Sequence, residues 1–405
     1  MDILKKISFN FIGIFSLTIL SGICCANGTS NSPPMGWNSW NTFGKNINES
    51  LIINTIDAMV KNGLRDSGYV YVVIDGGWKG TKLRTNGGLS YNEKKFPKGM
   101  KFLADYAHLH KMKLGLHLVA GTDTCTRGAQ GSYGNENQNL KTLKKWGIDF
   151  VKIDKCINKN KWTEQSIIKV YSKWGELLNN SGITYSMSAY KFYPCSTKFA
   201  QMARTTEDIS AKVDGLSGVK ATFDGEIENN KWSTLTVMEV AHENNKWAKF
   251  AGDGYWNDPD MLTTGDQGLS VEEQKSQFAL WSIMTAPLFL GNNPMNMSQK
   301  EKSIIMNKIA IKINQDITEQ GRLVKKQGKT EVWLKHLKNN QLAILLLNRD
   351  QKKSLDISYE INNDKASWDV FDVYNNKKLG VFKNQLSFKV LHDSSLFLLL
   401  MPKNT

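Results

Sequence analysis

Residues 33–315 alternate short apolar runs with longer amphipathic stretches, and this alternation is the strongest constraint on the fold. The apolar runs are rich in Val, Ile, Leu and aromatic residues, a composition typical of strands. We predict strands at residues 35–40, 69–75, 114–119, 150–154, 184–188, 202–206, 254–256 and 286–290. We predict helices between them at residues 49–62, 100–110, 139–146, 166–179 and 272–284. Strands that alternate with helices in this way predict an α/β fold, a (β/α)8 TIM barrel.

The composition changes near residue 321. Short β-like runs follow at residues 331–334, 342–348, 353–358, 367–372, 385–389 and 395–401. Paired asparagines such as Asn339-Asn340 separate several of these runs, as turn residues do between antiparallel strands. We therefore expect two domains: a catalytic barrel at residues 27–320, and a small C-terminal antiparallel β-sandwich at residues 321–405 that packs on the barrel.

Residues 1–26 have the pattern of a signal peptide. Two lysines precede a mainly apolar run at residues 7–23, and small residues follow it. The polar linker after this segment favours cleavage over a transmembrane anchor. We expect an exported protein that is periplasmic, secreted, or held at the cell surface by a lipid on Cys24 or Cys25. No later stretch is apolar enough to span a bilayer.

The formal net charge is +14, and the lysines responsible for it are spread along the chain. No basic stripe and no nucleic-acid-binding motif accompanies them, so we expect no nucleic-acid partner. A soluble lysine-rich surface explains the charge, and attraction to an anionic polysaccharide or membrane surface is the alternative. The sequence does not indicate an oligomeric state.

Polar side chains follow the predicted strands at their carboxyl ends. In a (β/α)8 barrel these ends meet at one mouth, where catalytic groups lie. The clearest case is the run at residues 149–156, where an apolar strand ends with Lys152 and Asp154 on one face. A buried carboxylate is unfavourable without a partner, so this position indicates either a functional role or a helix cap. The full set is Trp40, Asp75, His117, Lys152, Asp154, Ser188, Arg204, Asp208 and Asp260.

Two of these carboxylates, Asp154 and Asp208, indicate glycoside hydrolysis. A retaining glycosidase uses two carboxyl groups about 5–5.5 Å apart, one as nucleophile and one as acid/base. The sequence lacks the clustered His and Glu ligands of a metal-dependent barrel enzyme, so we expect no metal and no cofactor. A catalytically silent sugar-binding protein is a further interpretation, and the presence of both carboxylates argues against it.

A series of short motifs runs in order along the predicted barrel. The motifs are Pro-Met-Gly-Trp-Asn-Ser-Trp at residues 34–40, Ile-Asp-Gly-Gly-Trp at 74–78, Lys-Leu-Gly-Leu at 113–116, Lys-Ile-Asp-Lys-Cys at 152–156, Tyr-Trp-Asn-Asp-Pro-Asp-Met-Leu at 255–262, Ala-Pro-Leu-Phe at 286–289 and Ile-Asn-Gln-Asp at 313–316. With these motifs the chain resembles glycoside hydrolase family 27, the group of α-galactosidases (melibiases) and α-N-acetylgalactosaminidases. Trp-Asn-Asp-Pro-Asp-Met is the most specific of them.

The resemblance implies a retaining exo-hydrolase that releases terminal α-linked galactose from oligo- or polysaccharides by double displacement. It implies Asp154 as the nucleophile, Asp208 as the acid/base, and a disulfide between Cys125 and Cys156 beside the site. The galactose-configured substrate would then be contacted at Trp40, Asp75, His117, Lys152, Ser188, Arg204 and Asp260.

Three positions depart from the common α-galactosidase pattern. Gly76 stands where a second Asp commonly reads the 4- and 6-hydroxyls, and His117 replaces a frequent Tyr. The small Ser188 stands near where a bulkier residue often reads the 2-position. These departures leave the reaction class intact and the sugar open. The alternatives within the family are α-N-acetylgalactosaminidase, β-L-arabinopyranosidase and isomaltose-releasing dextranase.

Overall fold

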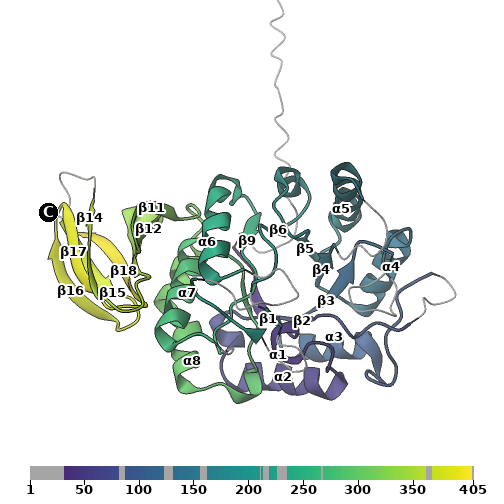
Figure 1. The fold of residues 1–405 in the computed structure, drawn as a ribbon. Coiled ribbons are helices and arrows are strands. Elements are labelled where there is room, and N and C mark those ends of the chain that lie inside the picture. Colours follow the sequence, from purple (N-terminus) through teal and green to yellow (C-terminus); the bar gives the residue numbers. More distant parts are fainter. Residues whose placement is uncertain are drawn as a thin grey trace, which may run out of the picture.

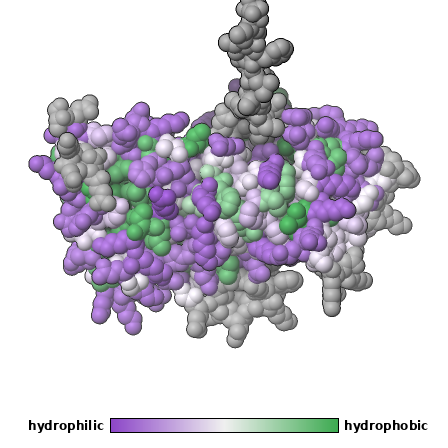
Figure 2. All heavy atoms as spheres, turned by 90° about the horizontal axis from the view of Figure 1, so that it is seen from above, coloured by the Kyte–Doolittle hydropathy of each residue, from purple (hydrophilic) through white to green (hydrophobic). Residues whose placement is uncertain are grey.

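The computed structural model describes residues 32–81, 87–122, 131–155, 162–209, 211–212, 219–225, 235–265, 268–361 and 367–403. They form a barrel and, beside it, a smaller β domain built from the C-terminal residues, which are yellow in Figure 1. On the face seen in Figure 2, hydrophilic side chains cover most of the described surface and hydrophobic ones form small patches. No helix in the described part of the chain is long and apolar enough to cross a membrane.

Parallel strands form the barrel. They are β1 (Met35–Asn38), β2 (Tyr71–Ile74), β3 (Lys113–Val119), β4 (Phe150–Asp154), β5 (Thr184–Ser188), β6 (Met202–Arg204), β9 (Trp256–Asp258) and β10 (Leu288–Leu290). Their order is β10-β1-β2-β3-β4-β5-β6-β9, and a parallel bridge between Leu262 and Leu290 joins the two edges. Each predicted barrel strand overlaps one of these strands, so the structure confirms the predicted (β/α)8 architecture. A small hairpin of β7 (Ala211–Lys212) and β8 (Val219–Lys220) follows β6.

Helices connect the strands, and the longer ones cover the outside of the barrel. They are α1 (Trp40–Phe43), α2 (Glu49–Lys61), α3 (Gly99–Leu109), α4 (Glu136–Trp146), α5 (Glu164–Leu178), α6 (Val237–Lys246), α7 (Val271–Ile283), α8 (Gln299–Ile305) and α9 (Lys308–Gln315). The local sequence determines where several of these helices begin. Helices α6, α7 and α8 each begin with a capping box, in which a Ser or Thr side chain and a Glu three residues later satisfy each other's backbone amides.

Apolar side chains fill the barrel below its mouth. This cluster consists of Tyr71, Val73, Phe150, Met202, Trp256, Met261 and Phe289. Gly36 allows β1 to approach β2 closely, because a Cβ at this position would lie 2.5 Å from the carbonyl oxygen of Tyr71. A filled interior gives the strand ends a rigid support, which a catalytic site needs.

The C-terminal domain is the expected antiparallel β-sandwich. Its strands are β11 (Arg322–Gln327), β12 (Thr330–His336), β13 (Leu342–Asn348), β14 (Leu355–Glu360), β15 (Ser367–Asp372), β16 (Lys377–Phe382), β17 (Gln385–Val390) and β18 (Ser394–Lys403). One sheet has the order β11-β12-β13-β18-β15-β16, and β14 pairs with β17. Apolar side chains such as Ile344, Ile357 and Leu386 form a separate core between these strands.

Helix α7 joins the two domains. Residues 276–283 of this helix are all buried, because the helix lies in the barrel wall and also contacts β12, β13 and β18. Ser276 donates a hydrogen bond to Ser395, and the hydroxyl of Tyr374 donates to the carbonyl of Lys275. Lys335 on β12 is fully buried at this junction, where its ammonium group donates to the carbonyl of Ile313 near the end of α9.

Candidate active site

The candidate active site lies at the carboxyl ends of the barrel strands. All nine side chains predicted there belong to the described part of the chain, on or just after β1 to β6 and β9. Direct contacts divide seven of them into two groups. One group contains Asp75, His117, Lys152 and Asp154, and the other contains Arg204, Asp208 and Asp260.

Asp154 is the last residue of β4 and is only 8% exposed. His117 Nε2 lies 2.8 Å from Asp154 Oδ2, and because an ionised carboxylate only accepts, the imidazole donates this hydrogen bond. Asp154 Oδ1 has no hydrogen-bond partner among the described residues. Burial raises the pKa of Asp154, but the charges of Lys152 and His117 lower it more, so this pKa lies well below its usual range. Asp154 is therefore an ionised carboxylate with one oxygen fixed and the other open.

Asp75 follows β2 and is held by three donors. Asn38 Nδ2 donates to Asp75 Oδ2 at 2.8 Å, and Lys152 Nζ lies 3.3 Å from the same oxygen. The amide of Gly76 donates to Asp75 Oδ1 at 2.7 Å. Burial raises the pKa of Asp75, but Lys152 and His117 lower it more, so the net shift is downward. Asp75 is therefore a second ionised carboxylate on this side of the mouth.

Lys152 lies among four carboxylates. Burial lowers its pKa, but the attraction of Asp154, Asp75, Asp260 and Asp208 raises it above the usual lysine value. Its ammonium group therefore stays charged at any pH at which a protein of this kind works. One cation thus stabilises the ionised form of the carboxylates on both sides of the site.

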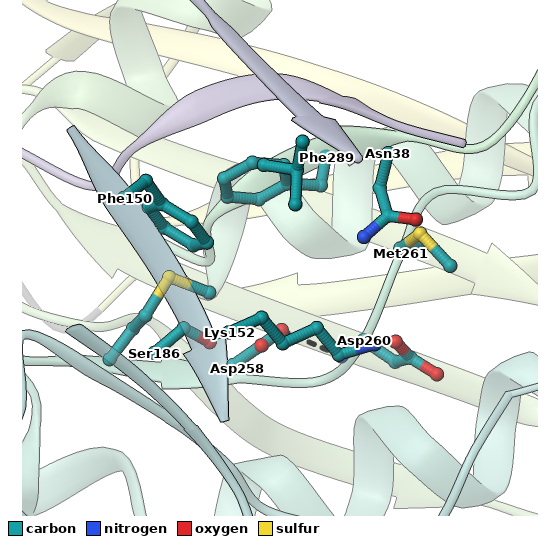
Figure 3. A pocket seen from close by; sticks show the side chains of 10 residues that line it. Asn38, Phe150, Lys152, Ser186, Asp258, Asp260, Met261 and Phe289 are labelled. Atoms are coloured by element: carbon teal, nitrogen blue, oxygen red, sulfur yellow. Dashed lines mark hydrogen bonds between the residues drawn. The ribbon is translucent and has the colours of Figure 1, made fainter. Parts of the chain in front are cut away.

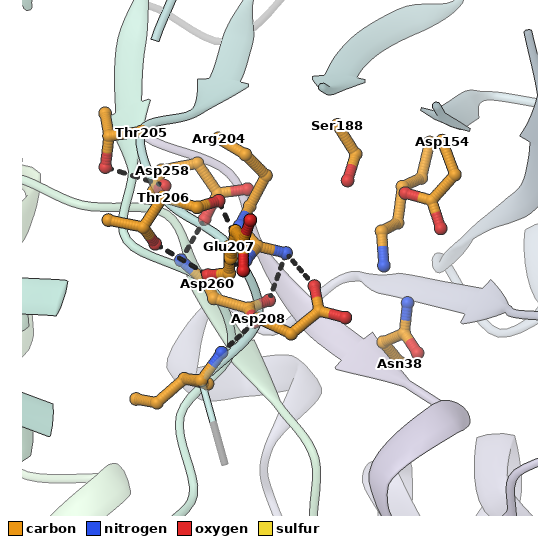
Figure 4. A network of polar contacts seen from close by, with 12 residues as sticks. Asn38, Asp154, Ser188, Arg204, Thr205, Thr206, Glu207, Asp208, Asp258 and Asp260 are labelled. Atoms are coloured by element: carbon orange, nitrogen blue, oxygen red, sulfur yellow. Dashed lines mark hydrogen bonds and ion pairs between the residues drawn. The ribbon is translucent and has the colours of Figure 1, made fainter. Parts of the chain in front are cut away.

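Arg204 is the last residue of β6 and is almost fully buried. Its Nη1 lies 3.0 Å from Asp208 Oδ1 and 3.1 Å from Asp260 Oδ1. Figure 4 draws these two contacts as dashed lines. Its Nη2 donates to the carbonyls of Thr206 and Glu207. The sequence predicted that Arg204 contacts the sugar. In the structure, both of its terminal nitrogens bind protein groups and connect the loop after β6 to the end of β9.

Asp154 and Asp208 reach the mouth from different strands. In Figure 4 their carboxyl groups point into the same space from opposite sides. The side chain of Asp208 is 55% exposed, whereas that of Asp154 is nearly buried. Ser188 Oγ, near Asp154 in the figure, is buried and makes no direct hydrogen bond within the described part of the chain, but it lies close enough to Asp154 to help lower the pKa of that carboxyl group. The two carboxyl groups therefore have different environments, as two groups with different tasks require.

The floor of the site combines an indole with a small cavity lined by both apolar and polar side chains. Trp40 follows β1, and its ring packs on the apolar cluster in the barrel. Its amide donates to Asn38 Oδ1 at 2.8 Å. A cavity of about 20 Å³, seen in Figure 3, lies below the mouth, and a volume of this size holds about one water. Its polar lining residues are Asn38, Lys152, Ser186, Asp258 and Asp260.

Three residues of the site were not predicted. Asn38 holds Asp75, and Asp258 Oδ1 accepts the amide of Asp260 at 2.8 Å. Both end a barrel strand, so the rule of strand ends could have found them. Tyr190 has φ = 62°, and burial together with the charges of Asp154 and Asp208 raises its pKa far above the usual tyrosine value. It lies in a loop without a recognisable pattern.

Two further expectations concern cysteines and metals. Cys125 and Cys156 lie outside the described residues, so their disulfide stays a prediction. Cys195 is a free, half-buried thiol. Over the described ranges, no group of three or more His, Cys, Asp or Glu side chains is arranged to hold a metal ion.

The chain is similar to known proteins over both of its domains. A family model described as "Alpha galactosidase A" matches residues 32–316, and one described as "Alpha galactosidase C-terminal beta sandwich domain" matches residues 327–399. Alpha-galactosidase 2 of Arabidopsis thaliana is 38% identical over 357 residues, which cover 86% of this chain and 85% of that protein. Alpha-N-acetylgalactosaminidase of Gallus gallus is 31% identical over 398 residues, covering 91% of this chain and 93% of that protein.

A solved structure is also similar to this chain over most of its length. Alpha-galactosidase I from Mortierella vinacea superposes with a TM-score of 0.83 at 29% identity, covering 94% of this chain and 99% of that one. The family models together span both domains, and the similarity extends over nearly the whole described chain. The chain therefore belongs to the α-galactosidase family, glycoside hydrolase family 27, and is a glycosidase of the α-galactosidase type that hydrolyses O-glycosyl bonds.

Proposed function

We propose that this protein releases terminal α-linked galactose from oligo- or polysaccharides with retention of anomeric configuration. Asp154 is the nucleophile and Asp208 the acid/base. The observation that carries this assignment is the contrast between the two carboxyl groups: Asp154 is buried and ionised with one open oxygen, and Asp208 is half exposed on the opposite side of the mouth. Double displacement needs one ionised carboxylate as nucleophile and one carboxyl group that exchanges protons, and this contrast supports those two roles.

In the first step, Asp154 Oδ1 attacks the anomeric carbon and forms a C–O bond. The bond from this carbon to the glycosidic oxygen breaks, and Asp208 transfers its proton to that oxygen, so that the leaving group departs as an alcohol. His117 holds Asp154 Oδ2 during the attack, which leaves Oδ1 as the reacting atom. The product of this step is a covalent galactosyl ester on Asp154.

In the second step, water enters from the exposed side, where Asp208 lies. The ionised Asp208 takes a proton from this water, whose oxygen attacks the anomeric carbon and displaces Asp154. Galactose leaves with the configuration it had in the substrate, and both carboxyl groups return to their starting protonation states. No group other than protein side chains and water takes part.

The sugar would be recognised by side chains on the Asp154 side of the mouth and at its floor. Asp75 and Lys152, already paired at 3.3 Å, offer an acceptor and a donor for neighbouring hydroxyls. The exposed part of Trp40 offers a flat apolar surface to the C–H face of a pyranose. The buried Ser188 hydroxyl, without a partner among the described residues, lies beside the nucleophile and would contact the sugar near its 2-position.

Two positions favour alternative sugars. Gly76 has no carboxylate for a 6-hydroxyl, and β-L-arabinopyranose has the galactose configuration without the 6-hydroxymethyl group. The small Ser188 leaves room for a 2-acetamido group, and a relative that matches nearly the whole chain carries the name α-N-acetylgalactosaminidase. Each of these activities would use the same two carboxyl groups.

The test is hydrolysis of a panel of p-nitrophenyl glycosides by the purified protein, with Asp154→Ala as the inactive control. The panel contains the α-galactoside, α-N-acetylgalactosaminide, β-L-arabinopyranoside and α-glucoside. Release from the α-galactoside, lost in Asp154→Ala, supports the proposal. A higher kcat/KM on another glycoside keeps the mechanism and reassigns the sugar. Undiminished activity in Asp154→Ala overturns the mechanism.

From the sequence alone, we also propose that the protein is exported and that it forms one disulfide bond. Residues 1–26 would be removed on export, and Cys125 would then pair with Cys156 in an oxidising compartment. Intact-mass measurement of the protein from its native host tests the first statement. A tryptic peptide that joins the two cysteines, and that separates on reduction, tests the second.

A further inference from the structure

Asp260 was expected to accept hydrogen bonds from the sugar, yet both of its oxygens contact protein groups. Asp260 Oδ1 lies 3.1 Å from Arg204 Nη1, and Asp260 Oδ2 accepts the amide of Ile209 at 2.9 Å. The side chain is only 6% exposed. Both oxygens of Asp260 are therefore held by groups at the end of β6 and in the loop after it, and one of these groups, the guanidinium, also pairs with Asp208.

The backbone of Asp260 is also held in an unusual state. Its φ is 79°, in the left-handed region that residues other than Gly rarely adopt. Asp258 Oδ1 accepts its amide at 2.8 Å, and Trp281 Nε1 donates to its carbonyl at 2.9 Å. The end of β9 and helix α7 therefore hold the backbone of Asp260, and strain of this kind persists only where the surroundings enforce it.

Asp208, by contrast, depends on its neighbours for its position. Its side chain is half exposed, and within the described part of the chain its ion-pair partner is Arg204 Nη1, the nitrogen that also contacts Asp260. The next residue, Ile209, is the one whose amide binds Asp260 Oδ2. Asp260 is thus linked to Asp208 in two ways. The guanidinium of Arg204 pairs with both carboxylates, and Asp260 also accepts the amide of the residue that follows Asp208 (Figure 4).

We propose that Asp260 is a positioning residue for Asp208: through Arg204 and the Ile209 amide it holds the proton donor in place, and it does not contact the sugar. This rests on the proposed role of Asp208 as acid/base. Asp260 would then act on the transfer of one proton to the leaving oxygen and not on the binding of galactose.

The protonation of Asp260 predicts that proton transfer by Asp208 depends on pH. Burial and the charge of Asp208 and Asp258 raise the pKa of Asp260 to about 6, although Arg204 and Lys152 lower it. Among the described residues, these four groups are the charged neighbours that face it, and they lie on or just after β4, β6 and β9. Below about pH 6 a proton on Asp260 replaces an ion pair to Arg204 by a neutral contact, so Asp208 loses part of its support and proton transfer weakens.

Leaving-group dependence separates positioning from sugar contact. Asp260→Asn keeps an oxygen for the Ile209 amide but removes the charge beside Arg204. A 2,4-dinitrophenyl leaving group departs without a proton, so its kcat/KM should stay within about 3-fold of wild type. An alkyl galactoside or a disaccharide needs the proton, and its kcat/KM should fall about 10–100-fold, part of the 10²–10⁴ that acid catalysis supplies. Inhibition by free galactose should not change.

Three controls make the result decisive. Asp208→Asn should show the same leaving-group pattern with a larger loss, and if it does not, the assignment of Asp208 fails whatever Asp260→Asn does. Asp105→Asn, on the exposed side of α3, should leave kcat/KM unchanged for every leaving group. If Asp260→Asn does not fold, Arg204→Lys, which keeps the charge but loses the planar fork, should give the same pattern.

The pH profile gives an independent measurement. For a poor leaving group, wild-type kcat/KM should show an acid limb near pH 6 that is absent in Asp260→Asn, because Asn does not titrate. Equal losses for all leaving groups, together with weaker inhibition by galactose, would mean that Asp260 contacts the sugar and would overturn the proposal. If the acid limb is unchanged in Asp260→Asn, Asp260 is not the group that causes it, and the pH argument is wrong.

Discussion

The imidazole of His117 lies 2.8 Å from one oxygen of Asp154, while the other oxygen of Asp154 has no partner among the described residues. The same ring nitrogen lies 4.0 Å from Asp75 Oδ1. His117 is therefore placed to fix the orientation of the nucleophile, and not only to line the sugar pocket as the sequence suggested. The asymmetry decides which oxygen attacks.

This relationship predicts a difference between two aromatic replacements. His117→Phe removes the donor, and a hydrogen bond to a charged group contributes about 1.5–3 kcal/mol, so kcat should fall about 10–100-fold with little change in KM. His117→Tyr restores a donor and should recover part of this loss. The rate of covalent labelling of Asp154 by a fluorosugar inactivator should follow the same order. Equal rates for the two variants would contradict the assignment.

The fold was predictable because its signal is local. Strand 150–154 and strand 184–188 appear with the expected bounds, since an apolar run followed by a polar residue marks a buried parallel strand. The structure also has β11 and β16, which were not predicted. Both are edge strands rich in lysine and mostly exposed, so they lack the apolar alternation that identifies a strand.

The site was predictable as a set of residues but not as a set of pairs. Strand ends converge by topology, which brings Asp154 and Asp208 to one mouth. Which carboxylate His117 or Arg204 contacts depends on side-chain direction across neighbouring strands, and sequence spacing carries no such information. The pairs of His117 with Asp154 and of Arg204 with Asp260 therefore emerge only from the structure.

Gly76 offers a direct test of sugar preference. Gly76→Asp places a carboxylate next to Asp75, where it could accept a hydrogen bond from a 6-hydroxyl. The ratio of kcat/KM for the α-galactoside to that for the β-L-arabinopyranoside should rise about 10-fold, the equivalent of about 1.4 kcal/mol. Gly76→Ala, which adds a Cβ without a charge, should leave this ratio unchanged. The ratio does not depend on how much enzyme is folded; a constant ratio in Gly76→Asp would exclude a role for this position.

Lys335 predicts a pH dependence of stability. Burial lowers its pKa to about 7, and Asp316 and Glu319 offset this only in part. An unfolded lysine has a pKa of about 10.4, so between about pH 7 and pH 10.4 the unfolded state binds more protons than the folded state. The free energy of unfolding contributed by Lys335 must therefore rise with pH across this window, by at most about 1.4 kcal/mol per pH unit.

The comparison that isolates this effect is Lys335→Met, which keeps the length of the side chain without a titrating group. The difference in free energy of unfolding between wild type and Lys335→Met, measured by urea denaturation, should shift in favour of wild type as the pH rises from 7 to 9.5. Lys338→Met, on the exposed turn after β12, serves as the matched control and should show no such trend. Parallel curves for wild type and Lys335→Met would show that the buried amine does not titrate here.

Gly36 connects barrel packing to the site. A Cβ at this position would lie 2.5 Å from the carbonyl oxygen and 2.6 Å from the Cβ of Tyr71, so β1 would have to move away from β2. Overpacking of this kind destabilises by about 1–3 kcal/mol, and we expect Gly36→Ala to lower the free energy of unfolding by that amount. Because β1 ends at Asn38, which holds Asp75, kcat should also fall at temperatures where the variant is fully folded. Gly328→Ala, in the turn between β11 and β12, lies in open space with φ = 58° and should lower only stability. If Gly36→Ala lost stability but kept full kcat, the position of β1 would not limit catalysis.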